Sequence, residues 1–240
     1  MTQEILETIF SMFATWVKDM PVACTKGCST CCTLNVSISW LEGARIHRFI
    51  KANCMEEWLA CQLDRTGPVS QPQMTANSFA ESLLAGRDIP LQPVEFTGVC
   101  PFLEDNLCCI YEVRPFGCVG FASLTPCHPG QPARVPASYM SATTAVNQIL
   151  EHLSRDRPWG NMISILLLLS EIPAFRQVSE ILNNPEKIRE HRNACLTAAP
   201  LPGFLIGNTE QAEVFPLLEK IYTAEISGSK LEDILNAGVT

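Results

Sequence analysis

The sequence predicts a mostly α-helical single domain with irregular, cysteine-rich loops. Apolar residues recur at helical spacing near both ends of the chain, and no alternation typical of a β-strand persists. Eight of the 12 cysteines fall in two short, irregular stretches. The chain has 240 residues and 47% hydrophobic content, which suffices for one large domain or two small ones.

The first helix is expected over residues 3–20, where apolar side chains recur at the spacing of a helix face. This face consists of Ile5, Ile9, Phe13, Trp16 and Met20. Pro21 interrupts the pattern, because proline does not continue a helix. The first group of cysteines follows in an irregular loop.

A second helix is expected from Ser39 to about residue 63, because Ser39 and Glu42 form a capping-box pattern. One stripe of that helix consists of Ile46, Ile50, Cys54, Trp58 and Cys61. Free cysteine packs as a small hydrophobe, so Cys54 and Cys61 are expected in the core rather than at a metal.

The remaining chain alternates between irregular segments and expected helices. A short helix is expected over residues 75–85, with Gly86 as its C-terminal stop. Residues 88–130 are rich in Pro, Gly and Cys and form a second loop region. Another capping-box pattern joins Ser229 and Glu232. Further helices are expected near residues 137–154, 160–172, 174–183, 209–223 and 229–237.

Charge and hydropathy disfavour two classes of function. The net charge is −8 and no Lys/Arg cluster is present, so no nucleic-acid partner is expected. The most apolar run, residues 162–169, is too short to span a bilayer, so no membrane partner is expected either. The N-terminus lacks the basic region of a secretory signal, and a cytoplasmic location is therefore expected. In that compartment disulfides are rare, and clustered cysteines more often bind metal or catalyse.

The two cysteine stretches are CTKGCSTCC, residues 24–32, and CPFLEDNLCCIYEVRPFGC, residues 100–118. Thiolates are soft ligands for zinc and iron, and spacings of two or three residues let neighbouring sulfurs converge on one centre. Coordination by cysteine alone fits either a four-cysteine zinc site or an iron–sulfur cluster. Residues 1–130 are expected to form a cysteine-cluster metal-binding region, and residues 131–240 a helical C-terminal region packed on it.

Adjacent Cys31 and Cys32 complicate a single mononuclear site, because neighbouring side chains in an extended loop point to opposite sides. Either the loop turns sharply, or the pair serves two centres, or one thiol is spare. The number of thiols also exceeds the need of one tetrahedral zinc. This count favours a polynuclear cluster or two sites.

The pattern resembles the CxxCxxCC, or YkgJ-type, cysteine-cluster family of zinc- or iron-chelating proteins. The matching motifs are the four-cysteine cluster, CPFL at residues 100–103, and C-x-I-Y-x-x-R-P-x-x-C at residues 108–118. The resemblance covers residues 24–118, and it departs from the family in its first spacing and at Val119, where arginine is frequent. It implies that the metal ligands are Cys24, Cys28, Cys31, Cys32, Cys100, Cys108 and Cys118.

Two further residues of the motif are expected beside the cofactor. Arg114 would offset the negative charge of a thiolate cluster, and Tyr111 would pack over the site and limit solvent access. The alternative for this pair is a loop-stabilising arginine and a core tyrosine. Cys109 is a substitute for its neighbour, and Cys127 or His128 is a candidate eighth ligand.

The other cysteine and histidines are expected to serve structure. Cys195 is expected in helix packing or as a free thiol. His47, His152 and His191 lie in or next to expected helices, and each is taken as a surface or packing residue.

Three functions remain open. The first is a metal-binding protein with an iron–sulfur cluster or zinc, a redox or metal-handling role, and a protein redox partner. The second is an enzyme. Residues 24–31 satisfy the cysteine spacing of radical S-adenosylmethionine enzymes without their βα alternation, and flagellin lysine N-methylases carry a related cluster domain, which implies methyl transfer. The third is a zinc-structured interaction module. No GxGxxG, P-loop or HExxH motif is present.

Overall fold

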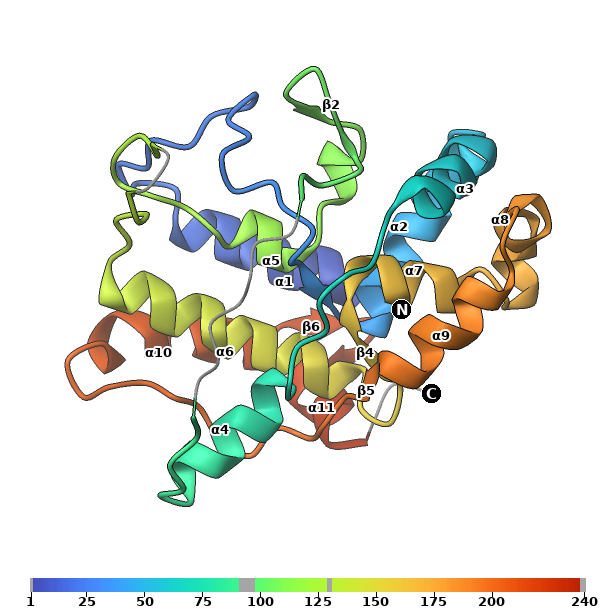
Figure 1. Ribbon diagram of the computed structural model, residues 1–240. Coiled ribbons are helices and arrows are strands. Elements are labelled where there is room, and N and C mark those ends of the chain that lie inside the picture. Colours follow the sequence, from blue (N-terminus) through green and yellow to red (C-terminus); the bar gives the residue numbers. More distant parts are fainter. Residues whose placement is uncertain (1, 91–97, 129–130, 238–240) are drawn as a thin grey trace.

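The computed structural model describes residues 2–90, 98–128 and 131–237 (Figure 1). Helices dominate this part of the chain, so the predicted mostly α fold class is confirmed. Part of the expected second loop region, 88–130, lies outside the described residues. The boundary expected at residue 130, between the cysteine-cluster region and the C-terminal region, also lies outside them. The helices are α1 (Thr2–Trp16), α2 (Trp40–Ala52), α3 (Glu56–Arg65), α4 (Ala76–Leu84), α5 (Phe116–Val119), α6 (Ala137–Leu153), α7 (Met162–Leu169), α8 (Arg176–Ile181), α9 (Glu186–Ala194), α10 (Gln211–Thr223) and α11 (Leu231–Ala237).

Short strands and two 3-10 turns, η1 (Tyr111–Val113) and η2 (Pro173–Phe175), connect these helices. The strands are too short for the side-chain alternation that identifies a strand in a sequence. In the described part of the chain the strands pair antiparallel, in a three-stranded sheet of order β1-β4-β5 and in two hairpins. The strands are β1 (Ser37–Ile38), β2 (Leu103–Glu104), β3 (Leu107–Cys108), β4 (Pro158–Asn161), β5 (Leu196–Thr197), β6 (Glu225–Ile226) and β7 (Ser229–Lys230).

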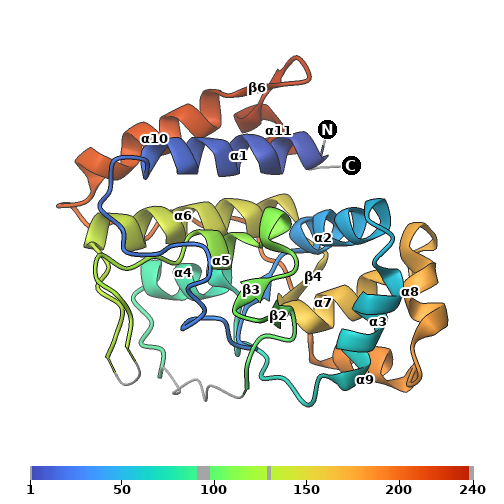
Figure 2. The ribbon, with the colours of Figure 1, turned by 90° about the horizontal axis from the view of Figure 1, so that it is seen from above.

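Two apolar clusters form the interior. The first core comes mainly from α1, α6, α10 and α11, and the second from α2, α3, α7, α8 and α9. Figure 2 shows α1 beside α10, with α2, α3 and α7–α9 gathered at the other end of the molecule. Each core contains residues from before and after position 130, such as Phe13 with Leu217 in the first and Ile50 with Leu166 in the second.

The expected helix from Ser39 to residue 63 is two helices. Its start is confirmed, since the Ser39 side chain accepts the backbone N–H of Glu42 and the Glu42 side chain returns to Ser39. The helix ends at Ala52, however, and Cys54 has a φ of 54° before α3 begins. A left-handed residue of this kind breaks the helical path.

This break makes the core assignment of Cys54 and Cys61 wrong, because both are exposed. The turn at Cys54 rotates α3, and the face that α3 buries carries Leu59, Ala60 and Leu63 instead. The stripe predicted for one continuous helix therefore does not extend across the break.

Other boundaries also differ from expectation. The first helix ends at Trp16 rather than residue 20, and the region expected to become helical at residue 160 begins as strand β4. Ser229 lies in the β6–β7 hairpin, and α11 begins only at Leu231. Helix α9 was not expected, because its sequence is strongly charged and only Ile188 is buried.

Helix α7, which is the most apolar run, is buried along its whole length. Gly43 of α2 lies against it, where a Cβ atom would meet Leu169 Cδ1 at 2.6 Å and Ile165 Cγ2 at 2.8 Å. No single helix in the described ranges is long and apolar enough to cross a membrane; α7 passes such a test only together with η2 and α8, across a 100° bend.

Candidate metal centre

The first cysteine loop folds into consecutive tight turns between α1 and β1. The N–H of Cys28 donates to the carbonyl of Thr25 at 3.0 Å, and the N–H of Cys32 donates to the carbonyl of Ser29 at 2.9 Å. Cys31 and Cys32 sit at the end of the second turn. The loop therefore turns sharply at this adjacent pair.

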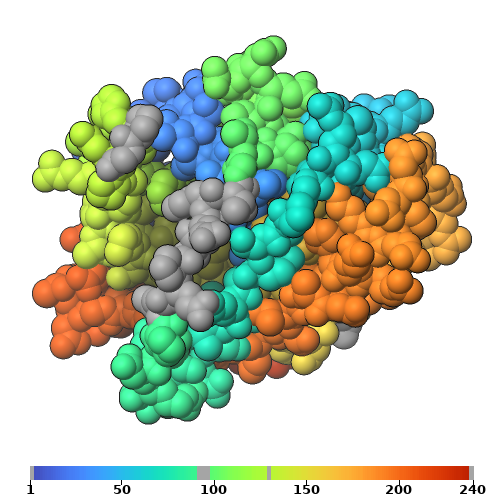
Figure 3. Space-filling model, in the orientation of Figure 1, coloured from blue at the N-terminus to red at the C-terminus, as the bar shows by residue number. Residues whose placement is uncertain are grey.

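The two cysteine stretches run side by side although 68 residues separate Cys32 from Cys100. The N–H of Cys100 donates to the carbonyl of Cys32 at 3.1 Å, and Thr33 and Val99 form an antiparallel bridge. Figure 3 shows the first stretch in blue against the second in green at one end of the molecule. Main-chain pairing thus joins the two halves of the predicted site.

The β2–β3 hairpin folds the second stretch back on itself. Leu103 pairs with Cys108 across the hairpin. Asp105 and Asn106 form its tip with φ values of 48° and 62°, which is the geometry of a tight turn between antiparallel strands. The Asn106 Oδ1 atom accepts a hydrogen bond from Ser29 Oγ at 3.0 Å, which ties the tip to the first stretch.

The last predicted ligand lies on the single turn α5. Pro115 restricts the residue before it, and Arg114 accordingly has an extended ψ of 137°. The chain then turns at once, since the N–H of Cys118 donates to the carbonyl of Pro115 at 2.9 Å. This turn brings Cys118 back toward the hairpin.

Four thiols from these segments influence one another electrostatically, and we call Cys32, Cys100, Cys108 and Cys118 the four-thiol group. Burial raises the pKa of the Cys118 thiol, and the other three raise it further, whereas the Arg114 guanidinium lowers it. Burial also raises the pKa of Cys100 to about 12, with Cys108 and Cys32 adding to the effect. The four thiols therefore share one partly desolvated region.

The other three predicted ligands surround Cys31. Burial raises the pKa of the Cys31 thiol to about 11, and Cys32, Cys24 and Cys28 add to the increase. The pKa of Cys32 is raised first by burial and then by Cys28, so Cys32 links these thiols to the four-thiol group. Within residues 2–90, 98–128 and 131–237, no three His, Cys, Asp or Glu side chains are arranged so that they could hold a metal ion together. The structure brings the seven cysteines near one another without converging them on a point.

Arg114 and Tyr111 interact with each other. The Arg114 Cζ atom lies 3.7 Å from the centroid of the Tyr111 ring, and its Nε donates to the Tyr111 carbonyl at 3.2 Å. Lys26, from the first cysteine loop, has its Nζ atom 5.3 Å from the same centroid. Arg114 lowers the thiol pKa of Cys32 and Cys108. Tyr111 thus holds a cation whose charge reaches the four-thiol group.

Two residues of α2 that were not predicted as part of the site hold the second stretch. The Glu42 Oε1 atom accepts the N–H of Phe116 at 2.7 Å. The Arg45 guanidinium donates to the carbonyls of Glu112 at 3.0 Å and Arg114 at 3.5 Å. The capping-box pattern locates Glu42, but that pattern assigns it only to its own helix.

The three further ligand candidates, Cys109, Cys127 and His128, differ from one another in burial and surroundings. Burial raises the pKa of Cys109 to about 11, with the Glu104 carboxylate as the next cause. Cys127 is half-buried and His128 is exposed. Cys195 packs against the second core, as expected for a structural thiol. All 12 cysteines, which lie within the described ranges, are free of disulfides.

The histidines in the expected helices serve packing. His47 is buried, and its Nε2 lies 2.8 Å from the carbonyl of Leu166. His152 Nε2 lies 3.0 Å from the carbonyl of Leu235, and His191 Nδ1 lies 2.7 Å from the hydroxyl of buried Ser164. None of them is among the groups that shift the thiol pKa values of the four-thiol group.

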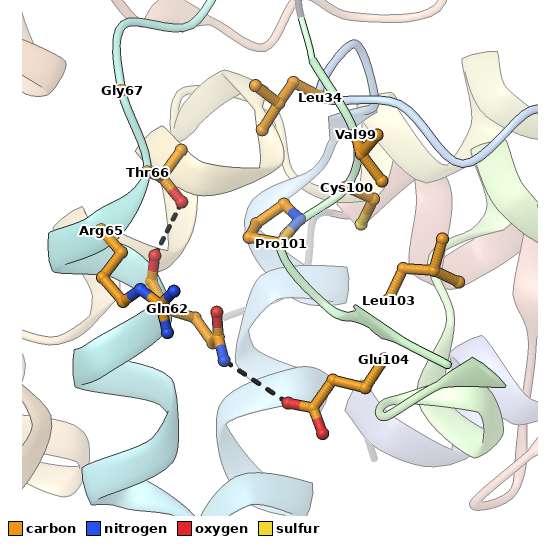
Figure 4. A pocket seen from close by; sticks show the side chains of 10 residues that line it. All are labelled: Leu34, Gln62, Arg65, Thr66, Gly67, Val99, Cys100, Pro101, Leu103 and Glu104. Carbon is orange, nitrogen blue, oxygen red and sulfur yellow. Dashed lines mark hydrogen bonds between the residues drawn. The ribbon is translucent and has the colours of Figure 1, made fainter. Parts of the chain in front are cut away.

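A cavity of about 590 Å³ opens beside Cys100, between the end of α3 and residues 98–104 (Figure 4). Its polar lining includes Arg65 and Glu104, and Glu104 accepts hydrogen bonds from Trp58 Nε1 at 2.8 Å and Gln62 Nε2 at 3.5 Å. Its apolar lining consists of Leu34, Val99, Pro101 and Leu103. One member of the four-thiol group therefore borders a space large enough for a small molecule.

Comparison of this chain with protein-family models, with curated proteins and with solved structures finds no match. The likeness of residues 24–118 to the cysteine-cluster family therefore rests on the motifs themselves. The chemistry of the thiols and of the groups around them therefore indicates what the site can do.

Proposed function

We propose that this protein belongs with the YkgJ-type cysteine-cluster proteins and holds iron, as an iron–sulfur cluster, or zinc. Its role would be redox or metal-handling chemistry in the cytoplasm, with a protein redox partner. The observation that supports this proposal is the four-thiol group, in which three separate segments bring four cysteines beside the Arg114 guanidinium. The ligands would be the seven cysteines predicted from the motifs.

The donor set fits a soft metal. The charged groups of the described residues that shift the pKa values of the four thiols are other thiols and the Arg114 guanidinium, rather than the carboxylates that magnesium or calcium would require. Crowded, partly buried thiols resist ionisation individually, and a bound cation would remove that resistance by neutralising their thiolates. A bound iron–sulfur cluster would supply one-electron transfer, whereas zinc would supply structural stability.

The number of thiols favours iron–sulfur over one zinc ion. One tetrahedral zinc takes four cysteines, which the four-thiol group alone would supply once its thiols converged on the metal. Cys24, Cys28 and Cys31 then remain beside Cys32. A polynuclear cluster, or a second centre, would use them.

The test is purification without oxygen, followed by measurement of iron, zinc and acid-labile sulfide per chain and of the visible spectrum. We expect iron and sulfide in matching amounts and broad absorption near about 400 nm. Cys118→Ser should lose most of the metal. Cys61→Ser is the matched control, because Cys61 is exposed on α3, and it should keep the wild-type content.

Each outcome has a distinct meaning. Zinc without sulfide would replace the redox role by a zinc-structured interaction module. Absence of both metals from protein that is folded by circular dichroism would contradict metal binding altogether. Equal metal content in Cys118→Ser and Cys61→Ser would show that the metal lies elsewhere in the chain.

The cavity beside Cys100 favours one alternative, a cluster-dependent methyltransferase related to flagellin lysine N-methylase. Such an enzyme needs a space beside the cluster for its methyl donor, and this cavity borders one of the four thiols. Titration of the metal-loaded protein with S-adenosylmethionine by calorimetry tests this alternative. Saturable binding that Arg65→Gln weakens would support it, and absence of binding would remove it.

A further inference from the structure

Helix α5, which carries Cys118, is fixed to the protein through Phe116. The Phe116 ring is fully buried, and its centroid lies 5.5 Å from that of Phe10 and 4.9 Å from that of Phe13, both on α1. The backbone N–H of the same residue donates to Glu42 Oε1 of α2 at 2.7 Å. Two helices therefore hold the residue that precedes Cys118 by two positions.

The Glu42 carboxylate has defined partners for both of its oxygens. Oε2 accepts the N–H and the O–H of Ser39 at 2.8 and 2.7 Å, while Oε1 accepts the N–H of Phe116. Only 4% of the Glu42 surface is exposed, and this burial raises the pKa of Glu42, while the hydrogen bonds from Ser39 and Phe116 oppose that rise. The carboxylate thus joins the start of α2 to the start of α5, with one oxygen on each.

Arg45 holds the same stretch three residues further along α2. Its two terminal nitrogens donate to the carbonyls of Glu112 and Arg114. Its Cζ atom also lies 5.2 Å from the Phe10 ring centroid, which restricts the guanidinium from its other side. Arg45 and Glu42 together hydrogen-bond three main-chain groups around Pro115, namely two carbonyls before it and one N–H after it.

We propose that Glu42 and Arg45 are positioning residues of the metal centre. Glu42 sets the place of the Cys118 thiol by fixing the first residue of α5. Arg45 sets the backbone from which the Arg114 side chain extends. Neither residue is a ligand. The metal-loss experiment rests on the proposed metal-binding function, and the alkylation experiment does not.

The first experiment compares Glu42→Gln with Glu151→Gln in the full chain. Glu151 is also fully buried, and the backbone N–H groups that its carboxylate accepts include those of Asn77 at 2.9 Å and Ala199 at 2.7 Å. Both variants should lose similar stability in chemical unfolding. Only Glu42→Gln should lose metal faster, by about tenfold or more, in a challenge with excess chelator. Equal metal loss in the two variants would overturn the proposal.

A second experiment needs no metal. Native metal-free protein is treated with iodoacetamide, and mass spectrometry follows the alkylation of Cys118 relative to Cys195. Loss of a charged hydrogen bond should open α5 more often, and Glu42→Gln should alkylate Cys118 about tenfold faster than wild type or Glu151→Gln. An unchanged Cys118 rate would contradict the role of Glu42 whether or not the wild type binds metal.

Arg45→Gln is the variant to use if Glu42→Gln does not fold. Arg45 is only half-buried, and it belongs to none of the ion pairs found in the described ranges. It should lower stability against denaturant less than Glu42→Gln does, because its guanidinium is only half-buried, and it should still accelerate metal loss to chelator. Wild-type retention of metal by folded Arg45→Gln would overturn its part of the proposal. Metal-free wild-type protein would refute the proposed function, and the alkylation result would then decide the positioning of Cys118 by itself.

Discussion

Arg114 is the cation of the described residues whose charge acts on the four-thiol group. It lowers the thiol pKa of three members, Cys32, Cys108 and Cys118, and the Tyr111 ring lies 3.7 Å from its Cζ atom. Because the proposed metal binding would gather thiolates, a fixed cation would stabilise the loaded site by attraction. Stacking against the ring keeps this cation in place.

We therefore expect Arg114→Gln to weaken metal retention by roughly 10- to 100-fold, the range for loss of an outer-shell partner. Competition with a chromophoric chelator at fixed pH measures this change. Arg189→Gln is the control, since Arg189 is exposed on α9 and pairs only with Glu186. Equal retention in the two variants would show that the guanidinium charge does not act on the site.

His47 introduces a pH dependence that is independent of the cysteines. Burial lowers its pKa from 6.5 to about 4, although the bond to the Leu166 carbonyl opposes this shift. Its Nδ1 atom has no partner, and its ring stacks on Phe175 with 4.8 Å between centroids. A neutral ring can donate from Nε2 to the Leu166 carbonyl. A charged ring would also carry a proton on buried Nδ1, which has no acceptor among the described residues.

The unfolded chain therefore takes up a proton at His47 before the folded protein does. The contribution of His47 to stability should be constant above about pH 6.5 and should fall by roughly 3 kcal/mol as the pH drops toward 4. Denaturant unfolding of metal-free protein at several pH values measures this slope. His47→Gln should flatten it, whereas the exposed His128→Gln should not.

At the scale of elements, local patterns predicted starts better than ends. The Ser39–Glu42 capping box marks the start of α2 because its hydrogen bonds lie within four residues. The end of α2 depends on Cys54 in a left-handed conformation, which a non-glycine residue adopts too rarely for a sequence pattern to signal it. Helix α9 escaped prediction because one buried side chain, Ile188, leaves no apolar periodicity.

The two cysteines of the mispredicted stripe offer a paired test. Cys54→Gly should raise the free energy of unfolding by about 0.5–1 kcal/mol, because glycine adopts a φ of 54° without the cost of a Cβ atom. Cys61→Gly should lower it by about 1 kcal/mol, because it places glycine inside α3. Denaturant unfolding of both variants measures the two signs, and equal signs would place the helix break elsewhere.

Gly43 governs how closely α2 approaches α7. Gly43→Ala would bring a Cβ atom to 2.6 Å from Leu169 Cδ1, and we expect a loss of about 1–3 kcal/mol of stability. Gly67→Ala is the control, since no atom lies within 4 Å of its added Cβ. Thermal unfolding should separate the two variants clearly. A tolerated Gly43→Ala would mean that α2 has room to move away from α7.

At the scale of the whole molecule, the motifs identified the thiols but not their support. Cys32 and Cys100 were predicted to share a site because two clusters of soft ligands suggested one centre, and their segments do pair. The bond from Phe116 to Glu42 spans 74 residues and involves a backbone group. Side-chain patterns in a sequence contain no information about such a bond. The contact of α2 with the second cysteine stretch could therefore be identified only from the structure.

Removal of metal should affect the whole fold and not only the loops. A ligand that binds the folded state alone raises its stability, and this site would join segments that lie between α1 and α6. We expect chelator to lower the midpoint of thermal unfolding of wild type in calorimetry. The midpoint of Cys118→Ser should shift much less, and an equal shift in both would indicate binding elsewhere.

Helix α1 has a further consequence for how the protein is made. Its indole at Trp16 donates to the carbonyl of Glu213 at 3.1 Å, 197 residues later in the chain. During synthesis the apolar face of α1 must wait for α10 to leave the ribosome, while the cysteine loop beside it is already exposed to the cell. The first core can therefore be completed only after α10 has been made.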